Sequence, residues 1–258
     1  MKYFRNKQAR PKKNKLILSV NAVMKALEEG GQAFDKIFVS STLSATVIGQ
    51  LKKAAALATV PVQVVPMAKL NAFNAGNHEG CVALKSRVTY QPLQAVIDWV
   101  VGEGRVPLFL MLDGITDVRN IGGIARTAFC TGVDAIIIPD KGVGALQEDA
   151  VLTSAGALEK IAICRVDSLL KAIDTLHLNG VQVYATQMKG NTSIEDVNFE
   201  IPCCIILGGE EKGIYPALLK GADSTVYIPM QGGVDSFNVS VSAGIILYEA
   251  MKQRVQRL

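Results

Sequence analysis

Residues 108–132, LFLMLDGITDVRNIGGIARTAFCTG, give the clearest indication of the fold. Its first five residues are apolar, which is typical of a strand buried on both faces of a sheet. A short loop follows, and then a helical pattern with Asn120 as its expected N-cap and Gly132 as its C-terminal stop. A buried strand that leads directly into a helix is the building unit of a parallel α/β sheet.

The rest of the second half repeats this alternation. Short apolar runs predict strands at Leu108–Leu112, Ala135–Ile138, Val181–Ala185, Cys204–Leu207 and Thr225–Ile228. Helices are expected between and after them, around 121–131, 146–155, 167–178 and 239–254. The predicted fold class is therefore α/β, with a mostly parallel sheet covered by helices on both faces.

The first half predicts a second, smaller α/β unit. Its expected helices are Val20–Glu29 and Ala45–Leu57, and its expected strands are Lys36–Ser40, Pro61–Val65 and Cys81–Leu84. The predicted organisation is a basic tail at 1–15, the small unit at 16–88, a connection at 89–106 and the large unit at 107–258. A short helix is expected within the connection, at Leu93–Val100.

Composition and charge indicate a soluble, folded protein with a basic arm. Of 258 residues, 49% are hydrophobic and 19% charged, and no apolar run approaches the length of a membrane span. The first 15 residues hold seven basic residues and no acidic one, although the formal net charge of the chain is only +4. Such an arm suits a phosphate backbone, with Lys12, Lys13 and Lys15 as contacts, or it is merely a solvated leader.

The cysteine content points to a reducing, cytoplasmic compartment without a metal site. There are five cysteines and two histidines, and no C-x-x-C motif occurs. Cys130 and Cys164 stand in apolar surroundings, where a free cysteine behaves as a small hydrophobic residue.

The helix after residue 120 carries two features that are unusual for a packed helix. Gly122 and Gly123 weaken its first turn by about 1 kcal/mol each, so we expect something to approach that backbone closely. Arg126 lies among apolar residues, where a guanidinium needs an acidic partner or an anionic ligand unless it simply reaches the solvent.

Two further glycine loops follow predicted strands. The loop Leu207–Gly213 contains Glu210 and Glu211, which would repel phosphate, and it matches neither nucleotide-phosphate motif. The segment Ile228–Gly244 places Ser236 and Asn238 before the last helix, with Asn238 as its expected cap. Because the usual parts of hydrolases and redox enzymes are absent, this set of residues suits transfer of a group from a bound donor to an oriented hydroxyl.

These three clusters, in this order, resemble the three motifs of the SpoU/TrmH family of RNA 2′-O-ribose methyltransferases, within the SPOUT superfamily. Asn120 and Arg126 match the first motif, Glu210 the second, and Ser236 with Asn238 the Ser-x-Asn of the third. The small first unit is similar to the ribosomal-protein-like RNA-binding domain of the branch that methylates guanosine in bacterial large-subunit rRNA.

The resemblance implies an S-adenosylmethionine-dependent enzyme with a deep C-terminal trefoil knot, acting as a homodimer on RNA. It implies catalytic roles for Arg126, Asn120, Glu210, Ser236 and Asn238, with Arg126 anchoring the nucleotide. It also implies cofactor contacts, which fall on Thr186, Gly208, Gly209, Ile228, Met230 and Phe237. His78 is either an RNA contact or a turn residue, and we favour the contact.

The substrate that the resemblance favours is 23S rRNA, because of the additional first unit. A tRNA 2′-O-methyltransferase and a catalytically silent RNA-binding or ribosome-assembly factor are the alternatives. No membrane or metal partner is expected.

Overall fold

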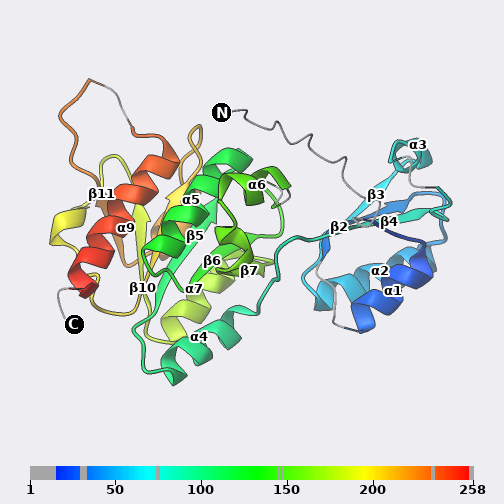
Figure 1. Ribbon diagram of the computed structural model, residues 1–258, viewed down its shortest axis with the longest axis horizontal. Helices are drawn as coiled ribbons and strands as arrows, with labels where there is room; N and C mark the ends of the chain where they lie inside the picture. Colours follow the sequence, from blue (N-terminus) through cyan, green and yellow to red (C-terminus); the bar gives the residue numbers. More distant parts are fainter. Residues whose placement is uncertain are drawn as a thin grey trace, which may run out of the picture. The chain divides into compact units, whose positions relative to one another are not determined.

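The computed structural model describes residues 16–29, 34–73, 76–144, 146, 148–233 and 236–255 (Figure 1). The chain divides into two compact units, with the boundary between Ser86 and Arg87. The predicted basic tail, with Lys12, Lys13 and Lys15, lies outside the described residues. No helix in the described ranges is long and apolar enough to cross a membrane.

The N-terminal unit is built on a four-stranded mixed sheet. Its strand order is β1 (Leu16–Leu18), β4 (Cys81–Lys85), β2 (Phe34–Ser40), β3 (Val62–Val65). β4 runs antiparallel to β1 and β2, whereas β2 and β3 are parallel. The helices α1 (Val20–Glu28) and α2 (Ala45–Leu57) pack on one face, and the short α3 (Met67–Asn71) packs on the other. The predicted helices and strands of this unit are confirmed, whereas β1 and α3 were too short to predict.

The C-terminal unit contains the parallel sheet that the sequence predicts. Its seven strands, in spatial order, are β7 (Ala162–Val166), β6 (Ala135–Pro139), β5 (Leu108–Asp113), β10 (Cys203–Gly208), β8 (Gln182–Thr186), β11 (Ser224–Tyr227) and β9 (Thr192–Ser193). Each neighbouring pair is parallel. Strand β9 was not predicted, because it spans only two residues. Strand β7 was not predicted either, because Arg165 interrupts its apolar pattern. In the fold that guanidinium is buried and lies 3.8 Å from the centroid of the Tyr90 ring.

Helices cover both faces of this sheet (Figure 1). The helices α5 (Val118–Cys130), α6 (Glu148–Thr153) and α9 (Val239–Val255) pack on one face. The helices α4 (Leu93–Gly102), α7 (Leu169–Leu178) and α8 (Pro216–Gly221) pack on the other. Strand β5 shows why both layers are needed, since Leu108, Leu110 and Leu112 face the first layer while Phe109 and Met111 face the second. Two short 3-10 turns, Ala157–Glu159 and Ile194–Asp196, complete the unit.

Helix α4 lies in the segment that we predicted to be a connection. Its apolar face, with Leu93, Val96, Ile97 and Val100, is buried in the core of the C-terminal unit. The helix is thus a structural part of that unit. The four-residue spacing of its apolar side chains is what a helix packed on a sheet requires.

Helix α5 begins earlier than the sequence suggested, which changes the role of Asn120. Its N-cap is Asp117, whose side chain accepts a hydrogen bond from the Arg119 backbone N–H at 2.8 Å. The prediction of Asn120 as the cap is therefore wrong, and its side chain is available for contacts outside the helix. The predicted stop is confirmed, because Gly132 follows the helix with a φ of 78°.

Candidate active site

The candidate site is built where β5 and β10 end side by side. Gly208, the last residue of β10, pairs with Asp113, the last residue of β5. The Asp113 backbone carbonyl accepts a hydrogen bond from Gly209 N at 2.9 Å, and its Oδ2 accepts one from Tyr215 N at 2.7 Å. Both ends of the loop 209–215 are therefore held to the carboxyl end of β5.

Glycine is required in this loop by close backbone contacts. A Cβ atom on Gly208 would lie 2.3 Å from the carbonyl carbon of Gly213, and one on Gly209 would lie 2.5 Å from the oxygen of Gly114. Contacts this short exclude any larger residue without movement of the backbone. The tight fold of the loop presents the exposed side chain of Glu210 at the carboxyl edge of the sheet.

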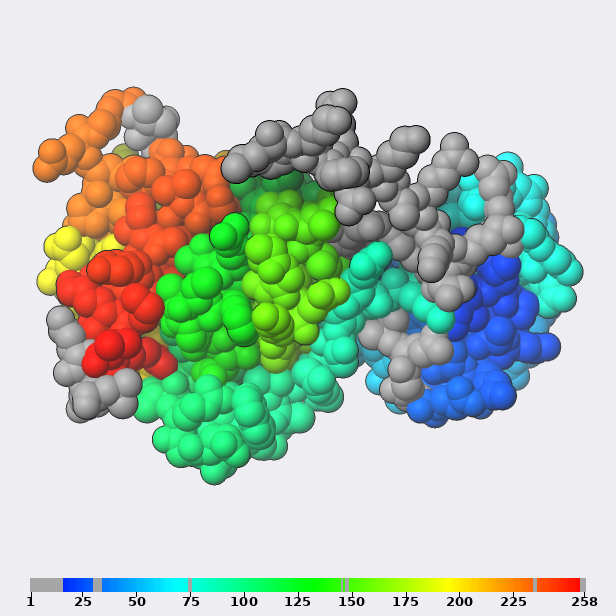
Figure 2. Space-filling view, in the orientation of Figure 1, coloured from blue at the N-terminus to red at the C-terminus, as the bar shows by residue number. Residues whose placement is uncertain are grey.

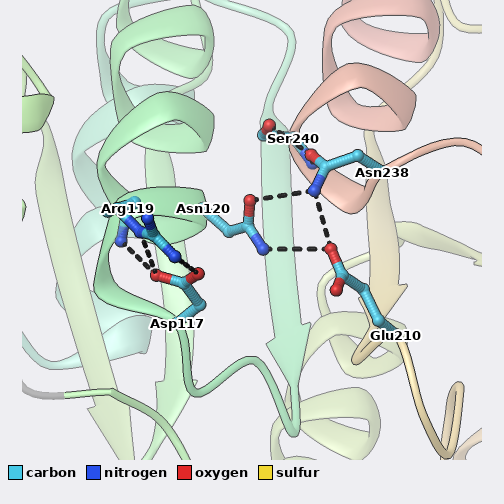
Figure 3. A network of polar contacts seen from close by, with 6 residues as sticks. All are labelled: Asp117, Arg119, Asn120, Glu210, Asn238 and Ser240. Carbon is cyan, nitrogen blue, oxygen red and sulfur yellow. Dashed lines mark hydrogen bonds and ion pairs between the residues drawn. The ribbon is translucent and has the colours of Figure 1, made fainter.

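Three side chains from distant parts of the sequence meet at this edge (Figure 3). Asn120 Nδ2 donates to Glu210 Oε1 at 3.1 Å. Asn238 Nδ2 donates to the same Glu210 oxygen at 2.7 Å and to Asn120 Oδ1 at 3.1 Å. We call Asn120, Glu210 and Asn238 the amide–carboxylate cluster. It contains three of the five residues for which a catalytic role was predicted.

Ser240 orients this cluster from the first turn of α9. Its backbone N–H and its Oγ both donate to Asn238 Oδ1, at 2.9 and 2.6 Å. Asn238 therefore caps α9, as predicted. The sequence analysis did not assign Ser240 a role in the site. Its position two residues after the expected Asn cap could have indicated one, because the backbone N–H at that position faces the oxygen of the cap side chain.

Arg126 and Ser236 do not join the cluster. Arg126 lies six residues further along α5, about 9 Å along the helix axis from Asn120, and its side chain is exposed. No described residue forms a hydrogen bond or ion pair with it. Ser236 is exposed in the loop before α9. The guanidinium of Arg126 is thus open to a ligand from solvent.

A second arginine stands at the rim of the site. Arg119 hydrogen-bonds Asp117 and forms an ion pair with it at 3.0 Å (Figure 3). These hydrogen bonds lower the pKa of the Asp117 carboxyl and raise the pKa of Arg119. The pair stabilises the start of α5, just before Asn120.

The residues with a predicted cofactor role follow three neighbouring strands, β10, β8 and β11. Thr186 ends β8, and its Oγ1 donates to the Ile206 carbonyl at 2.9 Å. Ile228 follows β11 and is partly buried against the core, while Met230 and Phe237 are 37% and 39% exposed. These residues offer apolar side chains and glycine backbone, and the loop after β10 adds the carboxylates of Glu210 and Glu211; this chemistry suits a cationic ligand that also carries a flat ring.

His78 is largely buried inside the N-terminal unit. It is 8% exposed, and both of its ring nitrogens are occupied. Nε2 lies 2.9 Å from Asn71 Oδ1, and Nδ1 accepts a hydrogen bond from Gly80 N at 3.1 Å. Both ring nitrogens thus have partners within the unit, and an RNA contact by His78 stays a prediction.

The cysteines divide into buried and exposed thiols. Burial raises the pKa of Cys81 and of Cys164 to about 12 and that of Cys203 to about 11, so these thiols are not nucleophiles at neutral pH. Cys130 is exposed, contrary to the apolar surroundings that we expected for it. Within the described ranges, no group of three or more His, Cys, Asp or Glu residues could hold a metal ion.

Comparison with known proteins identifies the relatives of both units. The model of the SpoU rRNA methylase family matches residues 107–248, and a model for RNA 2′-O ribose methyltransferase substrate binding matches residues 20–91. A Staphylococcus epidermidis protein, named for the TrmH family of tRNA/rRNA methyltransferases, is 32% identical over 93% of this chain and 96% of its own length.

Solved structures share the fold. AviRb of Streptomyces viridochromogenes, a SpoU methyltransferase in complex with the cofactor AdoMet, superimposes with a TM-score of 0.59 at 22% identity, covering 93% of this chain and 90% of its own. The TrmH/SpoU tRNA modifying enzyme of A. aeolicus is 28% identical, with a TM-score of 0.54, over 64% of this chain and 83% of its own. The two family matches and the similarity to the Staphylococcus epidermidis protein establish that the chain belongs to the SpoU family of RNA 2′-O-ribose methyltransferases.

Proposed function

We propose that this enzyme transfers the methyl group of S-adenosylmethionine to a ribose 2′-hydroxyl of 23S ribosomal RNA in the cytoplasm. The observation that carries the proposal is the amide–carboxylate cluster at the carboxyl edge of the sheet, since its three members come from the three family motifs. A silent RNA-binding factor would not need this cluster to be intact.

The cofactor fits the residues at this edge. S-adenosylmethionine carries a positive sulfonium and no phosphate, which suits a loop with Glu210 and Glu211. The half-exposed Met230 and Phe237 offer apolar surface to its adenine ring. When bound, S-adenosylmethionine supplies an electrophilic methyl group.

The chain's own residues then have to position a ribose. The reaction breaks the S–CH₃ bond, forms an O–CH₃ bond and releases the proton of the 2′-hydroxyl, so that oxygen must lie in line with the breaking bond. Arg126 anchors a phosphate of the target nucleotide and stabilises negative charge on its oxygen, because a guanidinium is permanently charged and has five donors. Asn120 and Asn238 both donate to Glu210 Oε1 and so orient this carboxylate.

The preference for ribosomal RNA rests on the N-terminal unit, which matches the substrate-binding model over residues 20–91. The relative from Staphylococcus is named for both tRNA and rRNA. Transfer RNA is therefore the second candidate substrate, and the same assay decides between them.

We also propose that the enzyme is a homodimer. Val241, Tyr248 and Val255 are about half exposed and are spaced seven residues apart on α9, which places them on one stripe of the helix. Figure 2 shows α9 (red) beside α5 (green) on one open face of the C-terminal unit. A second copy of the same face would cover these side chains.

The test combines binding and transfer. Calorimetric titration with S-adenosylmethionine is followed by tritiated methyl transfer onto unmodified rRNA and tRNA, and we expect binding with incorporation into rRNA. Arg126→Ala should abolish incorporation while leaving cofactor affinity within about threefold. Lys171→Ala, on the opposite face of the sheet, is the control and should remain active. Turnover by Arg126→Ala, or incorporation into tRNA alone, would contradict the proposal.

A further inference from the structure

The two faces of the N-terminal sheet are covered unequally. Helices α1 and α2 pack over one face, whereas α3 alone packs on the other. Lys36 and Phe38 are two positions apart in β2 and therefore point to the same side of the sheet. Since Phe38 belongs to the cluster beneath α3, Lys36 lies on the less covered face.

Two lysines converge on one aromatic ring of this face. The Nζ atoms of Lys36 and Lys69 lie 5.7 and 5.6 Å from the centroid of the Phe38 ring. Phe73 packs against the same ring at 5.2 Å between centroids. We call Lys36, Lys69, Phe38 and Phe73 the lysine–phenylalanine patch.

Neither lysine has an acidic partner among the residues that the structure describes. By contrast, Lys25 on the helical side of the unit pairs with Glu29 at 3.7 Å. Two ammonium groups that share one ring repel each other, and the apolar ring does not neutralise them. The patch is therefore electrostatically suited to an anion.

Charge also distinguishes between the possible binding partners of the lysine–phenylalanine patch. The first 15 residues of the chain hold seven basic residues and no acidic one, so they are repelled by the patch. A second copy would bring the same two lysines. An RNA strand offers phosphates at regular intervals, and cation contacts to phosphate release counterions and so favour binding.

We propose that the lysine–phenylalanine patch binds the phosphate backbone of the RNA substrate, through Lys36 and Lys69. The inference rests on the proposed function, because it assigns a surface to the RNA that the enzyme methylates. The competing explanation is that the aliphatic stems of the lysines only cover the apolar sheet while their charges stay in water.

The test distinguishes the effect of the two lysine charges from that of the aliphatic part of the lysine side chains. The double variant Lys36→Met and Lys69→Met keeps an apolar stem on the sheet but removes both charges. Its matched control is Lys52→Met and Lys53→Met, which removes two exposed lysines from α2 on the opposite face of the same unit. RNA binding and methyl transfer are measured for each at several salt concentrations, on the RNA that the wild-type enzyme methylates.

We expect the patch variant to bind RNA about tenfold more weakly and to lose about two units of slope in the plot of log affinity against log salt, one per lysine. Its affinity for S-adenosylmethionine and its rate at saturating RNA should match the wild type. The double variant Lys36→Arg and Lys69→Arg keeps both positive charges, so its slope of log affinity against log salt should equal that of the wild type.

The outcomes are distinguishable. If the wild-type enzyme binds S-adenosylmethionine but methylates neither rRNA nor tRNA, the proposed function fails. If the wild type methylates RNA and the patch variant behaves like the wild type or like the α2 control, the inference about the patch is overturned and the stem explanation holds.

Discussion

The carboxamide of Asn238 is oriented by a backbone group. The Ser240 N–H can only donate, so Asn238 Oδ1 faces it and Nδ2 is turned toward Glu210 and Asn120. Asn120 must then present Oδ1 to Asn238 and Nδ2 to Glu210. The direction of each hydrogen bond in the cluster is thus set from the start of α9.

Ser240→Ala tests this orienting role. The substitution removes the Oγ donor at 2.6 Å from Asn238 Oδ1 but keeps the backbone donor. A lost hydrogen bond of about 1 kcal/mol corresponds to a roughly fivefold slower methyl transfer. Cofactor affinity should be unchanged, because Ser240 has no predicted cofactor role.

Ser242→Ala is the matched control, since it removes a serine hydroxyl two positions further along α9. Single-turnover rates at saturating RNA provide the measurement. An equal slowing in both variants would mean that the effect comes from the helix and not from Asn238.

The paired glycines of α5 are explained by the neighbouring helices. A Cβ on Gly122 would lie 2.6 Å from the Cβ of Thr153 on α6. A Cβ on Gly123 would lie 3.4 Å from the Cβ of Ser240 on α9. We expected something to approach this backbone closely, and the structure shows that α6 and α9 do so. The approach of α9 brings Asn238 within reach of Asn120, one turn before Gly123.

The two glycines should respond differently to alanine. Gly122→Ala forces a shift of α6 and should lower the free energy of unfolding by about 2 kcal/mol, the usual cost of overpacking. Gly123→Ala meets an ordinary contact and gains helix propensity, so its change should stay within about 1 kcal/mol. Urea unfolding of both variants measures the difference, and equal losses would contradict this packing.

Across the C-terminal unit, alternation of apolar runs and helices was sufficient to predict the parallel sheet. It did not reveal β7, because the buried Arg165 breaks the apolar run. The motif residues were identified by resemblance, but their contacts join positions 90 and 118 residues apart, which no local pattern encodes. The trefoil knot implied by the resemblance stays a prediction.

The last helix, α9, makes contacts at both the carboxyl and the amino ends of the strands in the C-terminal sheet. Its first turn contributes to the amide–carboxylate cluster, while Arg254 in its last turn reaches the opposite, amino edge. There Nε donates to the Phe199 carbonyl at 2.7 Å, and the Nη atoms donate to the carbonyls of Val106, Pro107 and Ile201 at 2.7 to 3.0 Å. These carbonyls precede β5 and β10, the two central strands of the site.

Arg254→Ala should therefore destabilise the unit without impairing its chemistry. Several carbonyls lose a charged donor at once, which should lower the free energy of unfolding by about 3–5 kcal/mol.

Arg254→Lys should recover only a part of this lost stability, because one ammonium cannot reproduce the planar fork of a guanidinium. Lys252→Ala on the same turn, whose exposed ion pair with Glu249 spans 3.2 Å, should cost less than about 1 kcal/mol. Thermal melts measure the loss, and methyl transfer well below the melting temperature should stay within about twofold of wild type, since the candidate site lies at the other edge of the sheet. If Arg254→Ala had the melting temperature of the wild type, α9 would be held by its apolar contacts alone.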